Sequence, residues 1–133
     1  MVHMKAQLSQ VQWGLVLKTA VVLYLLTLIL GLGLSLLLQV FLNRSHLDQG
    51  AIQSFTVITA LLVVVVTGYG ALWVARKVDR AATLHGFLVG MVVALISFLL
   101  DLAFSGAIHS VGLVLYVLMV ASGLLGGVLG RRR

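Results

Sequence analysis

The sequence from Thr19 to Leu38 reads TAVVLYLLTLILGLGLSLLL and contains no charged residue. A helix of about 20 apolar residues is long enough to cross the hydrocarbon core of a bilayer. The run is also longer than the roughly 7–15 apolar residues at the centre of a cleaved signal peptide. We therefore expect this stretch to be a membrane-spanning helix of the protein.

Three further apolar stretches of similar length follow, and we expect helical spans at about residues 13–42, 52–75, 84–104 and 111–130. The β-branched run from Val63 to Val66 would favour a strand in water. In lipid, backbone hydrogen bonds must close within a helix or a closed barrel, and these stretches lack the alternation of barrel strands. The sequence therefore predicts an all-α membrane protein.

The composition indicates a single domain that is embedded in the membrane. The 133 residues are 62% hydrophobic and 9% charged, whereas a soluble domain has about 45–50% apolar and about 25% charged residues. The links between the apolar stretches are short, so neighbouring helices must be antiparallel. We expect residues 1–133 to form one up-down four-helix transmembrane bundle.

The basic residues predict the orientation of this bundle. With four spans, eight of the nine Lys and Arg residues fall on one side, and only Arg44 falls on the other. The positive-inside rule makes the first side cytoplasmic, with both termini inside. This bias also argues against small exporters and channels that insert in both orientations, because those proteins keep their basic residues nearly balanced.

The net charge of +6 would suggest nucleic acid as the partner of a soluble protein. Here the basic residues lie beside apolar spans, so we expect anionic lipid headgroups and no nucleic acid. The candidate lipid contacts are Arg76, Lys77, Arg80, Arg131, Arg132 and Arg133. The alternative is that these residues only determine topology.

A weak internal repeat relates the second and fourth expected helices. One constant offset aligns Thr67 with Ser122, Ala71 with Gly126, and Ala75 with Gly130. The two halves would then be hairpins of the same orientation, which is a parallel repeat. The alternative is that any helix that ends on the inner side commonly has small residues followed by basic residues. Both interpretations stay open.

Small residues recur every three or four positions on each expected span, which places them on one helix face. In a bilayer, helices associate where small residues let their backbones approach. The residues that we expect to pack in this way are Gly86, Gly90, Gly123, Gly126, Gly127 and Gly130. The alternative interpretation, a stripe lining a conduction path, needs more polar groups than these faces carry.

Asp101 is the only acid within a span, and an intramembrane carboxylate is a functional candidate. It lies about 24 Å along the third helix from His85, close to the outer surface. Gln39, Arg44 and His109 should lie at a similar depth. We expect a structural polar cluster in which Asp101 pairs with Arg44 or His109. The alternative is proton or cation coupling.

The sequence holds no pattern that predicts an enzyme, a metal site or a cofactor. The chain has no cysteine, which excludes thiolate chemistry. Its four histidines lack the spacing of metal ligands on a helix. The glycine-rich segments lie inside apolar spans and lack the lysine of a phosphate loop, so we expect them to pack.

One part of the chain resembles a known family. The run from Gly68 to Lys77, GYGALWVARK, is followed by Thr83 to Gly90, TLHGFLVG. A glycine-rich span with a basic end, then Leu-His-Gly at the start of the third helix, resembles the YrzE-like group of small bacterial four-helix membrane proteins. The resemblance implies the fold and a bacterial membrane location, and it implies no activity.

Two functions follow as expectations. The first is a non-enzymatic inner-membrane protein that acts as an accessory, scaffold or assembly component. It would form a homo-oligomer or bind a partner in a membrane complex. The alternative is a small ion- or proton-coupled transporter or channel that acts as an oligomer with Asp101 as the coupling group.

Overall fold

The computed structural model describes residues 11–42, 49–78, 80–105 and 110–131 of the chain. This part of the chain forms four α-helices and no strand: α2 (Trp13–Leu42), α3 (Gln49–Lys77), α4 (Ala82–Ser105) and α5 (Ser110–Gly130). Each helix contains a stretch that is long and apolar enough to cross a membrane. The prediction of an all-helical membrane protein with four spans is therefore confirmed.

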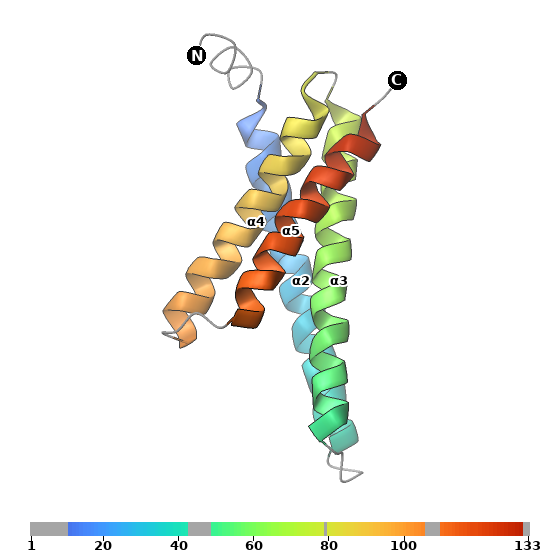
Figure 1. Cartoon of the computed structure of the whole chain (residues 1–133), viewed down its shortest axis with the longest axis vertical. Helices are drawn as coiled ribbons and strands as arrows, with labels where there is room; N and C mark the ends of the chain where they lie inside the picture. Colours follow the sequence, from blue (N-terminus) through green and yellow to red (C-terminus); the bar gives the residue numbers. More distant parts are fainter. Residues whose placement is uncertain (1–10, 43–48, 79, 106–109, 132–133) are drawn as a thin grey trace.

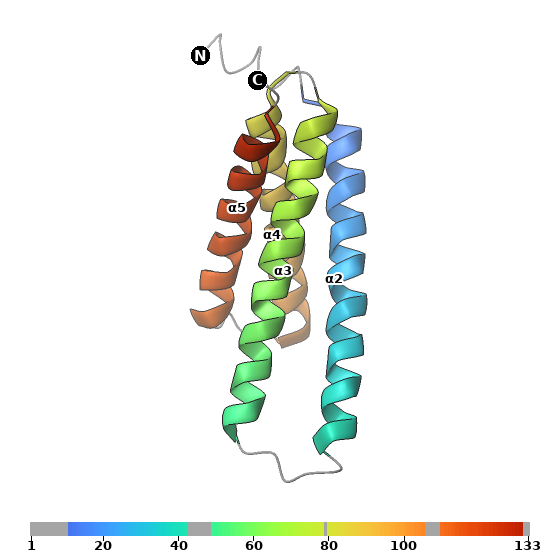
Figure 2. The same cartoon turned by 90° about the vertical axis from the view of Figure 1, so that its right-hand side faces the viewer.

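Successive helices run antiparallel, and the start of α2 lies at the same end of the bundle as the end of α5 (Figure 1, Figure 2). The two hairpins differ in length. α2 and α3 have 30 and 29 residues, whereas α4 and α5 have 24 and 21. The α2–α3 hairpin therefore projects beyond the α4–α5 hairpin, and the two diverge toward their tips (Figure 1).

The helices do not close into a symmetric ring. α3, α4 and α5 pack on one another, and α2 packs on α3 and α4. Within the described ranges α2 makes no close approach to α5, although a regular up-down bundle brings its first and last helices together. The helix arrangement is thus a tight group of three, with α2 at its side.

Buried side chains gather in the half of the bundle that holds the start of α2 and the end of α5, which we call the packed half. Among the side chains that the structure describes, α2 has no buried residue after Leu23 and α3 none before Thr67. Likewise, α4 has none after Ala94 and α5 none before Met119. We call the other half, where the hairpins diverge, the open half.

The contact between α3 and α5 brings together residues that the internal repeat makes equivalent. Gly126 packs on Ala71, and Gly130 packs on Ala75. Equivalent helices meet in this way when two halves are related by an axis along the membrane normal. However, α4 contacts α3 while α2 does not contact α5 in the described chain, so the two halves are not placed symmetrically.

Candidate functional site

Asp101 lies on α4 in the open half and accepts a hydrogen bond from the hydroxyl of Tyr116 on α5. The Tyr116 ring packs edge-on against Phe98 of α4, with ring centroids 5.8 Å apart at 86°. Gly112 lies one turn before Tyr116, and a Cβ there would come within 3.3 Å of the Tyr116 hydroxyl oxygen. The absence of a side chain at Gly112 therefore leaves room for this hydroxyl.

A cavity of about 210 Å³ adjoins Asp101 and is lined by residues of all four helices. Its polar residues are Tyr24 and Thr27 on α2, Ser97 and Asp101 on α4, and Tyr116 on α5; its other residues are apolar. The Thr27 hydroxyl donates its proton to the Tyr24 carbonyl oxygen at 2.8 Å. Thr27 can therefore offer the cavity only an acceptor oxygen.

The cavity reaches from the middle of the bundle toward the tip of the α4–α5 hairpin. Tyr24 lies about 16 Å along α2 from Trp13, and Asp101 lies about 28 Å along α4 from Ala82, at 1.5 Å per residue. A bilayer core is about 30 Å thick. The carboxylate is therefore at the open-half end of the cavity, and the phenol of Tyr24 is near the membrane midplane.

The cluster that we expect around Asp101 is only partly described. Gln39 is exposed on α2 and does not line the cavity. Arg44 and His109 lie outside the described residues, so their pairing with Asp101 stays a prediction. The structure brings two tyrosines to the cavity that the sequence analysis did not select. A signal for them is present in the sequence. Tyr24 shares a helix face with Ala20 and Thr27, and Tyr116 shares one with Gly112, so both fall on the small or weakly polar faces of their spans.

His85 joins the start of α4 to the start of α2 in the packed half. The side chain is fully buried. Its Nε2 accepts a hydrogen bond from the Gln12 backbone N–H at 3.0 Å. Nδ1 therefore carries the proton of a neutral imidazole, and it donates to the Ala81 carbonyl oxygen at 2.9 Å. Ala81 has a left-handed backbone with φ of 54°, so the imidazole bonds to a strained residue.

The six glycines of the expected packing stripes all lie at helix–helix contacts of the packed half. A Cβ on Gly123 would lie 2.7 Å from the Gly90 Cα, and one on Gly127 would lie 2.8 Å from the Thr83 carbonyl oxygen. On the adjacent face of α5, a Cβ on Gly126 would lie 2.9 Å from the Leu72 nitrogen. Gly86 and Gly90 provide the matching surface of α4.

Four of the six expected lipid contacts are described, and they lie at the end of the packed half. Arg76, Lys77, Arg80 and Arg131 are exposed there, and Arg132 and Arg133 lie outside the described residues. The Lys77 ammonium lies over the Trp73 ring, 3.6 Å from its centroid. A cation held over an aromatic face is stabilised by the ring quadrupole.

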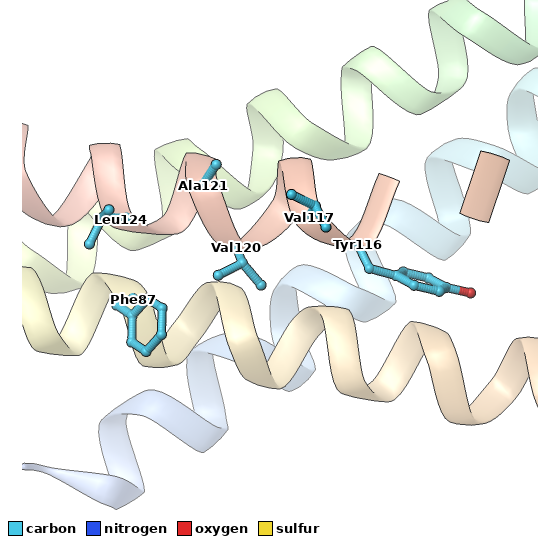
Figure 3. Close-up of a pocket in the computed structure, with 6 residues that line it drawn as sticks. All are labelled: Phe87, Tyr116, Val117, Val120, Ala121 and Leu124. Carbon is cyan, nitrogen blue, oxygen red and sulfur yellow. The ribbon is translucent and has the colours of Figure 1, made fainter. Parts of the chain in front are cut away.

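A second cavity lies on the outside of the bundle, between α4 and α5. Its volume is about 370 Å³, and Phe87 faces Val120 and Leu124 across it (Figure 3). The Tyr116 hydroxyl points away from Phe87 (Figure 3). The lining is otherwise aliphatic, so this groove offers no polar group that would orient a ligand.

A family model described as a protein of unknown function (DUF3792) matches residues 12–130. The match covers all four helices. It does not carry the name YrzE-like. No curated protein matches the chain, and no solved structure does.

Proposed function

Since the chain belongs to the DUF3792 family of proteins of unknown function, we propose a function from its geometry: the protein is a small cation- or proton-coupled membrane carrier with Asp101 as its coupling group. The observation that carries this proposal is the position of the polar cavity. It lies in the loosely packed half of a bundle whose other half is tightly packed.

The two halves of the bundle support access from one side. Glycine backbones pack closely where α5 meets α3 and α4 in the packed half, and His85 links the start of α2 to the same region. The hairpins diverge in the open half, where Asp101 is exposed. Alternating-access proteins combine one closed side with one open side, and this arrangement corresponds to the state that is open toward the side of Asp101.

The lining chemistry favours a small cation or a proton. Asp101 provides the negative charge, and Thr27, Ser97 and the two tyrosines provide oxygen atoms. Hard cations prefer oxygen ligands, and intramembrane carboxylates mark proton and ion pathways. A volume of about 210 Å³ suits an ion with a few waters, because each water takes about 30 Å³.

Flux through reconstituted vesicles tests this proposal. We expect Asp101→Asn to lower the flux of the coupled cation or proton at least about tenfold, because the amide carries no charge. Its oxygen can still accept the hydrogen bond of Tyr116, so the fold should be retained. The assay uses vesicles loaded with dyes for protons, sodium and potassium.

Gln39→Ala is the matched control, because Gln39 is a polar residue of the open half that does not line the cavity. Equal flux for the parent and Asp101→Asn would refute the role of Asp101. Absence of flux for all three cations, in either direction of the gradient, would refute the carrier function.

A second function, an accessory or assembly component, is supported by the exposure of α2. Only 11% of the residues in its most apolar stretch are buried within the chain. The remaining surface is free to contact lipid, a second copy or another membrane protein. A stoichiometric partner on purification in mild detergent, combined with absence of flux, would favour this function over the first.

We also propose the setting of the protein. Both termini lie in the cytoplasm of a bacterium, because the basic residues gather at the packed end. Anionic lipids surround that end, and the carrier acts as an oligomer. We also propose that the protein is not an enzyme, since its sequence contains no recognisable set of catalytic residues. We retain the YrzE-like group as the proposed identity of the family, on the Leu84-His85-Gly86 motif.

A further inference from the structure

A groove of about 400 Å³ runs between α2 and α3 in the packed half, away from the Asp101 cavity. Its floor is almost wholly apolar, and Val22 and Leu23 of α2 line it together with Gly70 of α3. A Cβ on Gly70 would overlap the methyl groups of Leu23. Gly70 therefore leaves room for the Leu23 side chain where α2 packs on α3.

The end of the groove nearest the start of α2 and the end of α3 carries cationic and aromatic side chains. Lys18 of α2 and Trp73 of α3 both line it, and Lys77 covers the Trp73 ring at 3.6 Å. Lys18 lies about 7 Å along α2 from Trp13, and Lys77 is the last residue of α3. Tryptophan and lysine at this depth lie at the boundary between headgroups and hydrocarbon.

This combination fits one kind of occupant. The apolar floor favours a hydrocarbon chain. Lys18 lines the groove, and Lys77 contacts the Trp73 ring that lines it, so these two ammonium groups favour a negative charge at headgroup level. A free anion would leave the apolar floor uncovered, and a zwitterionic lipid carries no net charge to match Lys18 and Lys77. Volumes of about 300–1,000 Å³ are typical of ligand sites.

We propose that the α2–α3 groove is a binding site for one anionic phospholipid, with an acyl chain along Val22 and Leu23 and its phosphate between Lys18 and Lys77. The site is independent of the proposed carrier function, because it shares no residue with the Asp101 cavity. It also differs from a diffuse basic surface, because it selects the lipid at one position.

Tryptophan fluorescence measures occupancy of this groove. Trp13→Phe leaves Trp73 as the only tryptophan, and acyl chains brominated along their length quench an indole that they contact. In phosphatidylcholine vesicles, we expect brominated phosphatidylglycerol to quench Trp73 at a lower mole fraction than brominated phosphatidylcholine. Lys18→Gln and Lys77→Gln should each reduce this preference about fivefold, which corresponds to about 1 kcal/mol per lysine near an anionic surface.

Two matched controls separate a site from general attraction. Arg131→Gln removes an exposed charge at the same end of the bundle but outside the groove, and it should leave the preference unchanged. Val22→Phe fills the groove and should abolish the quenching at low mole fraction. Val21→Phe adds the same bulk to an exposed neighbour that does not line the groove and should preserve it.

Three results would overturn the proposal: equal quenching by the two brominated lipids, an effect of Arg131→Gln as large as that of the lysine variants, or equal quenching in Val22→Phe and the parent. If Lys18→Gln fails to insert, Lys77→Gln carries the same comparison.

Discussion

The imidazole of His85 shows how one side chain stabilises the packed half. The first N–H groups of a helix have no partner within that helix, and Nε2 accepts one of them just before α2. Nδ1 donates to Ala81 at the start of α4. The sequence places His85 at the inner end of a span and within the Leu-His-Gly motif. Nothing in a local pattern shows that Gln12, 73 positions away, lies beside it.

We expect His85→Leu to destabilise the protein. The leucine fills the buried volume but leaves the Gln12 N–H without its acceptor, at a cost of about 1–3 kcal/mol. The Ala81 carbonyl keeps the hydrogen bond from the backbone N–H of residue 85. Thermal unfolding in mild detergent, followed by circular dichroism, measures the loss. Gln39→Leu, at an exposed position of α2, is the control, and an equal melting temperature for His85→Leu and the parent would contradict this role.

At the scale of the element, α5 is the helix on which the packing depends. Its glycines form two adjacent stripes, of which Gly123 and Gly127 face α4 while Gly126 and Gly130 face α3. Leucine gains little by leaving lipid for protein, so close backbone approach provides the association energy. The spacing of these glycines predicts that they pack, but it does not say which stripe faces which helix.

Two glycine substitutions separate packing from helix propensity. Gly123→Ala places a methyl group 2.7 Å from the Gly90 Cα, and we expect a loss of about 1–3 kcal/mol from overpacking. Gly31→Ala meets no atom within 4 Å and should stabilise α2 by up to about 1 kcal/mol, because alanine is the better helix former. Denaturation by sodium dodecyl sulfate, monitored by circular dichroism, compares the two. Equal stabilities would show that the α4–α5 contact is not close.

For the whole molecule, the hairpins differ in both length and packing. The longer α2–α3 hairpin projects beyond the shorter one (Figure 2), and the buried residues gather near the chain ends. A bundle of this shape has one end held by glycine contacts and one end where the helices diverge. The described residues Arg76, Lys77, Arg80 and Arg131 are exposed at the packed end, so the proposed orientation places the Asp101 cavity toward the outer side.

Because the chain has no cysteine, single cysteines can report its orientation. We expect Asn43→Cys to react with a membrane-impermeant maleimide in intact cells, whereas Arg80→Cys should react only after the membrane is opened. The physical reason is the excess of basic residues on the Arg80 side. Mass increase on gels measures the labelling. Reaction of both cysteines in intact cells would indicate insertion in both orientations, and the reverse pattern would place the termini outside.

The amino-acid pattern alone is sufficient to predict the membrane environment, the number of spans and their alternating direction. In lipid, only helices and closed barrels satisfy the backbone, and runs such as Thr19–Leu38 lack the alternation of barrel strands. The short links then require neighbouring helices to be antiparallel. These properties are local, so composition and spacing are sufficient to predict them.

Which helix faces meet is visible only in the three-dimensional packing. It placed Tyr116 on Asp101, His85 against Gln12, and Lys18 beside Trp73. It also showed that α2 packs beside α3 and α4 and away from α5. These contacts depend on the rotation and tilt of each helix. In lipid the apolar faces have similar energies, so small residues and single hydrogen bonds, which a sequence pattern does not pair, select the arrangement.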